Sequence, residues 1–78
     1  MERKVYLTYS RDLIKEPLIY NVGHKYKVVT NIRQASISDK IGLVALELDG
    51  EIEEIKKAIN YFRENGVTVE PIEKNVIE

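Results

Sequence analysis

The segment from Lys27 to Ile37 places the strongest constraint on the fold of this chain. It is rich in β-branched residues, which predicts a long strand. Its alternation breaks in the middle, because Val28 and Ile32 share one parity whereas Ala35 has the other. A strand whose side chains point alternately to two faces cannot switch parity without an extra residue. We therefore expect a bulge, a bend or a late strand start near residues 32–34.

The rest of the chain shows the periodicities of further strands and two helices. Alternating apolar residues predict strands before and after the central segment, and apolar residues three and four apart predict the helices. A short polar turn over residues 38–42 predicts an antiparallel hairpin. The expected strands are residues 4–9, 27–37, 43–49 and 67–72. Of the two expected helices, the first starts near Pro17 and the second runs from about Glu51 to Asn65.

The resulting order is strand, helix, strand, strand, helix, strand. Right-handed crossovers place both helices on one face of an antiparallel four-stranded sheet, which makes the chain an α+β, ferredoxin-like βαββαβ sandwich. We expect the first and last strands to be central neighbours and the second to lie at an edge. The other sheet face carries no helix and is half apolar, so we expect it to meet a second copy of the chain. This face is built from Tyr6, Thr8, Leu43, Ala45, Glu47, Thr68 and Glu70.

Composition excludes several classes of function. Twelve basic residues are nearly matched by thirteen acidic ones, so the net charge of −1 argues against a nucleic-acid surface. Without cysteine there is no disulfide, thiolate metal site or cysteine nucleophile, and the single histidine, His24, is weak evidence for a metal. We therefore expect no cofactor. Since no apolar run approaches the length of a membrane span, we also expect no membrane insertion and a cytoplasmic location.

Five features at consistent spacing carry a resemblance to a known family. They are the Pro17-Leu18-Ile19 helix start, Tyr26 followed by Val28-Val29-Thr30-Asn31-Ile32, the turn ending at Gly42, Leu46-Glu47-Leu48-Asp49-Gly50, and Gly66-Val67-Thr68-Val69-Glu70. Together they make the run from Val5 through Ile72 similar to the NIL domain, named for an Asn-Ile-Leu signature. That domain is found at the C-terminus of methionine-importer ATPases and in proteins fused to ferredoxin modules. We expect a NIL-like domain over residues 1–73 and a frayed tail over residues 74–78.

The resemblance implies an ACT-like regulatory domain that forms a homodimer and binds a small amino acid, methionine in the transporters. By similarity, Asn31 corresponds to the signature asparagine that contributes to the ligand site. An amide offers both donors and acceptors to an ammonium or a carboxylate. We expect Ile32 to supply an apolar wall. Arg33 stands where the family name has leucine, and as our own hypothesis it clamps a carboxylate.

Each of these residues also has a purely structural interpretation. Asn31 is as well suited to satisfying backbone groups at the irregular strand, and a charged Arg33 discourages unwanted pairing at an edge. Tyr6 and Tyr9 resemble base-stacking aromatics of RNA-binding sheets, but the third strand supplies no aromatic partner, which favours packing or dimer contact.

The sequence bears on two other classes of function. Arg11 and Asn31 resemble the arginine and asparagine of acylphosphatases, which share this topology, but residues 10–15 lack the glycine-rich phosphate cradle. No Ser/His/Asp or Cys/His set exists either, so we expect no enzyme activity and no catalytic residues. The alternative is a ligand-free docking module for an enzyme or ferredoxin of sulfur-amino-acid metabolism, and we expect an enzyme or a transporter as a partner.

Overall fold

The computed structural model describes residues 1–72 of the 78-residue chain. The predicted frayed tail over residues 74–78, together with the last residue of the predicted domain, lies outside this range. The elements are β1 (Glu2–Ser10), a 3₁₀ turn η1 (Arg11–Leu13), α1 (Leu18–Lys25), β2 (Val28–Ile37), β3 (Ile41–Gly50), α2 (Ile52–Glu64) and β4 (Thr68–Pro71).

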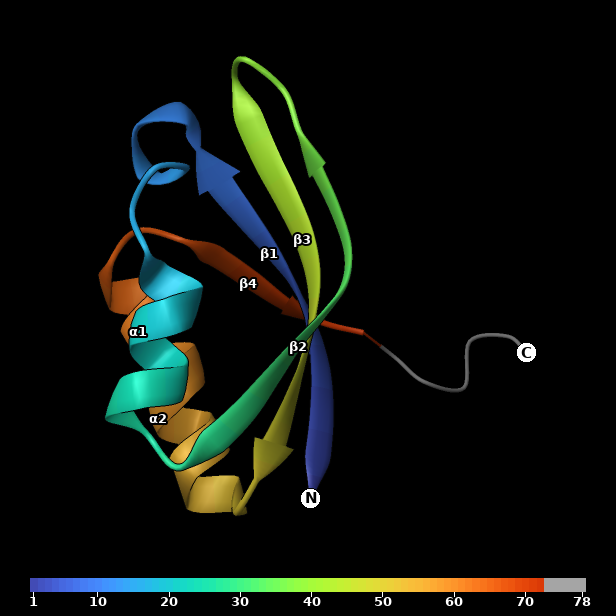
Figure 1. Cartoon of the computed structure of the whole chain (residues 1–78), viewed down its shortest axis with the longest axis vertical. Coiled ribbons are helices and arrows are strands. Elements are labelled where there is room, and N and C mark those ends of the chain that lie inside the picture. The colour runs from blue at the N-terminus through green and yellow to red at the C-terminus, as the bar shows by residue number, and fades with distance from the viewer. Residues whose placement is uncertain (73–78) are drawn as a thin grey trace, which may run out of the picture.

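The four strands form one antiparallel sheet in the order β2-β3-β1-β4. Both helices lie on the same face of this sheet, and the opposite face is uncovered by any helix (Figure 1). The predicted α+β ferredoxin-like sandwich is therefore confirmed. The predicted central position of the last strand is wrong, since β1 and β3 are central and β4 is an edge. The crossover through α1 leaves a one-strand gap between β1 and β2, and the hairpin strand β3 fills it.

The hydrophobic core lies between the helices and the covered face of the sheet. Alternate residues of β1 and β3 point toward the helices, and their partners come from the apolar stripes of α1 and α2. Burying this face supplies the main driving force for folding. The core residues include Val5, Leu7, Tyr9, Val44, Leu46 and Leu48 of the sheet and Leu18, Val22, Ile55, Ala58 and Phe62 of the helices.

The predicted irregularity in β2 is confirmed as a β-bulge. Ile32 pairs with Leu46 and Gln34 pairs with Ala45, so Arg33 is an extra residue with no partner in the β2–β3 register. The bulge switches the parity of the strand. Beyond it, Ala35 faces the helix side of the sheet, whereas Gln34 turns to the uncovered side.

The start of β2 is fastened to the first turns of α2 by Glu54. The backbone N–H of Lys27 donates a hydrogen bond of 2.9 Å to Oε1 of Glu54, and Nζ of Lys57 donates one of 3.3 Å to Oε2. These contacts hold the pKa of Glu54 below its ordinary value, with the hydrogen bond from Lys27 as the largest cause and that from Lys57 as the next. This contact fixes where β2 begins relative to the helix layer.

Candidate functional site

The uncovered side of the sheet, here called the open face, presents side chains in rows that run across the strands. The strand registers place Asn31 opposite Glu47 and Glu47 opposite Lys4, which makes one row wholly polar. Residues opposite each other across strands are close enough to interact. The polar row therefore places an amide, a carboxylate and an ammonium group side by side near one end of the open face.

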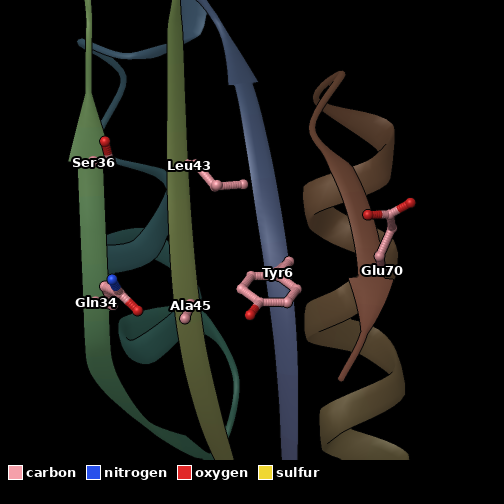
Figure 2. A pocket seen from close by; sticks show the side chains of 6 residues that line it. All are labelled: Tyr6, Gln34, Ser36, Leu43, Ala45 and Glu70. Atoms are coloured by element: carbon pink, nitrogen blue, oxygen red, sulfur yellow. The ribbon is translucent and has the colours of Figure 1, made fainter. Parts of the chain in front are cut away.

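The next two rows of the open face mix apolar and polar side chains. Ala45 lies between Gln34 on β2 and Tyr6 on β1, and the row beyond it contains Leu43. A shallow hollow of about 380 Å³ lies over these rows. Figure 2 shows the ring of Tyr6 lying between β1 and β3, toward Ala45, so that the aromatic face and the small side chain form the floor. The lining residues are Tyr6, Gln34, Ser36, Leu43, Ala45 and Glu70.

The polar row is organised by Glu47, whose exposed fraction is only 8%. Its Oε2 lies 3.7 Å from Nη1 of Arg33 and 3.9 Å from Nζ of Lys4. The two cations are much more exposed than the carboxylate. The side chain of Arg33 thus reaches from the bulge to the open face, where its guanidinium lies next to the carboxylate of Glu47.

Asn31 is exposed on the open face at the β2 edge of the sheet. Within residues 1–72, its side-chain amide makes no hydrogen bond. The alternative role, in which the amide satisfies backbone groups at the bulge, therefore has no support in the contacts. An edge strand also leaves main-chain N–H and C=O groups without strand partners on its outer side. The amide of Asn31 is free to address a ligand.

The structure separates Ile32 from the other two predicted ligand residues. Ile32 pairs with the core residue Leu46 and so points to the helix side of the sheet, opposite to Asn31. It is 56% exposed because the helices do not extend over this part of β2. There it lines a second hollow, of about 220 Å³, with Tyr9, Ile14, Leu18, Ala35, Ile37 and Val44 among its neighbours. An apolar wall beside Asn31 comes from Ala45 and Tyr6 instead.

Two residues of the hollow on the open face were not predicted from the sequence. Gln34 and Ser36 were not assigned to the open face, although the parity switch in β2 carried that information. With the extra residue at Arg33, both side chains must lie on the side opposite to Ala35. The ion pairs of Glu47 had no such signal, because they depend on how the long side chains of Lys4 and Arg33 are oriented.

The structure places Arg11 and Asn31 far apart. Arg11 lies seven residues beyond Lys4, in the turn after β1, whereas Asn31 shares a row with Lys4. At about 3.3 Å per residue, roughly 20 Å of strand separates Arg11 from that row. The structure thus keeps apart the two residues that an acylphosphatase-like reaction needs together. His24 lies in the last turn of α1, and its ring stacks on that of Tyr20 with the ring centroids 5.6 Å apart.

Over residues 1–72 no group of three or more His, Cys, Asp or Glu side chains is placed so that it could hold a metal ion. No helix in the same range has the length and apolar character needed to cross a membrane.

Comparisons with known proteins agree with this architecture. The family model of the NIL domain matches residues 3–71. The methionine import ATP-binding protein MetN of Halalkalibacterium halodurans is 36% identical over 74 residues. That match covers 90% of this chain but only 22% of the relative, so the chain spans about a fifth of the relative's length. The crystal structure of a C-terminal domain of an ABC transporter ATP-binding protein from Enterococcus faecalis is 28% identical and superposes with a TM-score of 0.82, covering 92% of this chain and 84% of that one.

Proposed function

The chain belongs to the NIL domain family, and from this premise we propose that it is a homodimeric regulatory domain that binds a small amino acid with an apolar side chain. The relative from Halalkalibacterium halodurans is named for methionine import, which makes methionine and similar amino acids the first candidates. The homology to a C-terminal domain of transporter ATPases supports a regulatory rather than a catalytic role.

One observation carries the proposal: a row of charged and amide groups adjoins a hollow whose floor is formed by Tyr6 and Ala45, on the same uncovered face. A free amino acid has the same division, with a compact zwitterion at one end and a side chain at the other. The row of Asn31, Glu47 and Lys4 suits the zwitterion, and the floor of Ala45 and Tyr6 suits the side chain. The hollow of about 380 Å³ falls within the usual size range of small-molecule sites.

A second copy of the chain is the proposed cover for this shallow site. Tyr6 and Leu43 are 41% and 43% exposed on the open face, which leaves apolar surface in contact with water. Pairing two open faces removes this surface from water and encloses the hollow. Ala45 lies opposite Tyr6 and Thr8 lies opposite Leu43 on the same face, so both then become part of the dimer contact.

Asn31 and Arg33 have distinct proposed roles. Asn31 donates or accepts hydrogen bonds at the zwitterion, and Arg33 attracts its carboxylate. The guanidinium of Arg33 lies 3.7 Å from the carboxylate of Glu47, beyond hydrogen-bond distance. Glu47 therefore compensates its positive charge only in part, and the remaining charge attracts the carboxylate of the ligand. Replacing Arg33→Leu tests the clamp by calorimetry, since unchanged or tighter binding would remove it from the site.

The proposal is tested by thermal unfolding of the dimer in the presence of single amino acids. A ligand present at a hundredfold its dissociation constant adds about 2.7 kcal/mol to stability, which raises the melting temperature of a domain of this size by several degrees. We expect such a rise with L-methionine or a related amino acid, and light scattering should report twice the mass of one chain.

A matched pair of variants locates the effect on the open face. Asn31→Ala removes the free amide at the β2 edge and should weaken ligand binding about tenfold. Asn60→Ala removes the same group from an exposed position on α2, which covers the opposite face of the sheet, and should leave binding unchanged. Equal effects of the two substitutions would contradict a ligand site at Asn31.

The second candidate function is a docking module that binds no small ligand. The half-apolar open face favours it, because a partner enzyme, ferredoxin or transporter component would bury that face equally well. A flat melting screen across methionine, homocysteine and the other amino acids would favour docking over ligand binding. The cytoplasmic location expected from the sequence stays a prediction under either function.

A further inference from the structure

Glu47 combines a buried stem with accessible oxygen atoms. The side chain is only 11% exposed, yet its partners Arg33 and Lys4 stand at 3.7 and 3.9 Å, beyond hydrogen-bond distance. Within residues 1–72 no buried side-chain oxygen or nitrogen lacks a hydrogen-bond partner. Since the carboxylate of Glu47 accepts no hydrogen bond from a side chain, its oxygens must reach the surface of the open face.

Both ion pairs converge on one oxygen of this carboxylate. Oε2 is the atom that lies nearest to Arg33 and Lys4, and no side-chain hydrogen bond of residues 1–72 reaches Oε1. Packing of the stem holds the group in place, so little side-chain entropy remains to be lost when a ligand binds. Oε1 is therefore a preorganised acceptor for one more cationic donor.

The position of Glu47 defines what that donor belongs to. It lies beside Asn31 in the polar row and two residues from Ala45, which forms the floor of the hollow. Alternate residues on one face of a strand are about 7 Å apart. A group bound at Glu47 is thus within reach of a short apolar side chain lying over Ala45 and Tyr6.

We infer that Glu47 binds the ammonium group of the ligand, so that the site selects free α-amino acids over analogues that lack the amino group. The inference rests on the proposed amino-acid binding and deepens it by naming the residue that sets specificity. Arg33 and Lys4 then serve the carboxylate end of the ligand.

The first experiment compares two ligands on the wild-type protein by calorimetry. L-methionine and 4-(methylthio)butyrate share the side chain and the carboxylate, but only the first has an ammonium group. We expect the butyrate to bind about tenfold to a hundredfold more weakly, as for the loss of a charged hydrogen bond. Equal affinities would overturn the inference and leave amino-acid binding intact, whereas binding of neither ligand would overturn the proposed function as well.

The second experiment assigns the discrimination to Glu47. Glu47→Gln keeps the shape of the side chain and should weaken L-methionine by at least about tenfold while changing the butyrate by about twofold or less. Glu47→Asp, which keeps the charge, should retain part of the preference if Glu47→Gln does not fold. Glu53→Gln, the matched control at an exposed carboxylate on α2, should keep it in full. Full discrimination by both Glu47 variants would assign the ammonium group to another residue.

Discussion

The two faces of the sheet are made from the same strands but differ in almost every physical property. On the helix side, Leu7 and Leu46 are fully buried in a continuous apolar core. On the open face, their neighbours Tyr6 and Ala45 line a shallow hollow beside a polar row. One face therefore accounts for the stability of the domain, and the other is free to differ in chemistry at little cost to folding.

The bulge in β2 adjusts this division where it matters most. Without an extra residue at Arg33, the strand could not have both Ile32 and Ala35 on the helix side. The bulge turns Gln34 toward the hollow and lets the guanidinium of Arg33 reach Glu47. Bulges commonly re-aim side chains next to functional sites, and this one lies between the polar row and the hollow.

The largest expected effect breaks the helix side of the comparison. Leu46→Ala should lower the free energy of unfolding by about 2–5 kcal/mol, because it leaves a cavity in the core. Leu43→Ala on the open face should lower it by about 1 kcal/mol or less in dilute protein, since Leu43 is already 43% exposed. Urea unfolding of both variants measures the difference. Equal losses would contradict the division of roles between the faces.

A charge on the open face should break the dimer without unfolding the chain. Leu43→Glu places two carboxylates in the proposed dimer contact and should raise its dissociation constant at least about tenfold. Ile37→Glu, on the helix side of β2 with 61% of Ile37 exposed, is the matched control and should leave the dimer intact. Light scattering over a dilution series distinguishes them, and dissociation by the control alone would place the dimer contact on the opposite side.

The smallest expected effect concerns Glu54 on the helix side. Because the hydrogen bond from Lys27 holds the pKa of Glu54 below its ordinary value, its contribution to stability is present at neutral pH and lost as the pH falls through the folded-state pKa. The difference in melting temperature between wild type and Glu54→Gln should therefore shrink from about pH 7 to about pH 3. The control is Glu53→Gln, which changes the neighbouring exposed carboxylate 3.9 Å from Lys56 on the same helix. A difference for Glu54→Gln that grows toward acid pH would contradict this account.

Most of the fold could be predicted from the sequence because one periodicity dominates each segment. Even the bulge was predictable, since the parity change between Ile32 and Ala35 requires one extra residue. The edge position of β4 was missed because the gap filled by β3 was not considered. Asn31 and Ile32 were expected together, but neighbours along a strand point to opposite faces, so Ile32 lies on the helix side of the sheet and Asn31 on the open face.

The features of the site that could not be predicted depend on distances between strands. Neither the ion pairs of Glu47 nor the hollow over Ala45 follows from local periodicity, because both arise from strand register and side-chain orientation. A carboxylate between two core leucines, Leu46 and Leu48, was visible in the sequence only as the polar phase of an alternating strand.

The most direct test of the two-face account is a titration of the ¹⁵N-labelled protein with L-methionine, followed by the backbone amide resonances. We predict saturable shifts concentrated at Asn31, Gln34, Ala45 and Glu47 on the open face. Resonances around the second hollow, near Ile14 and Leu18, should stay in place. Shifts centred on that hollow, or none at millimolar methionine and related amino acids, would contradict a ligand site on the open face.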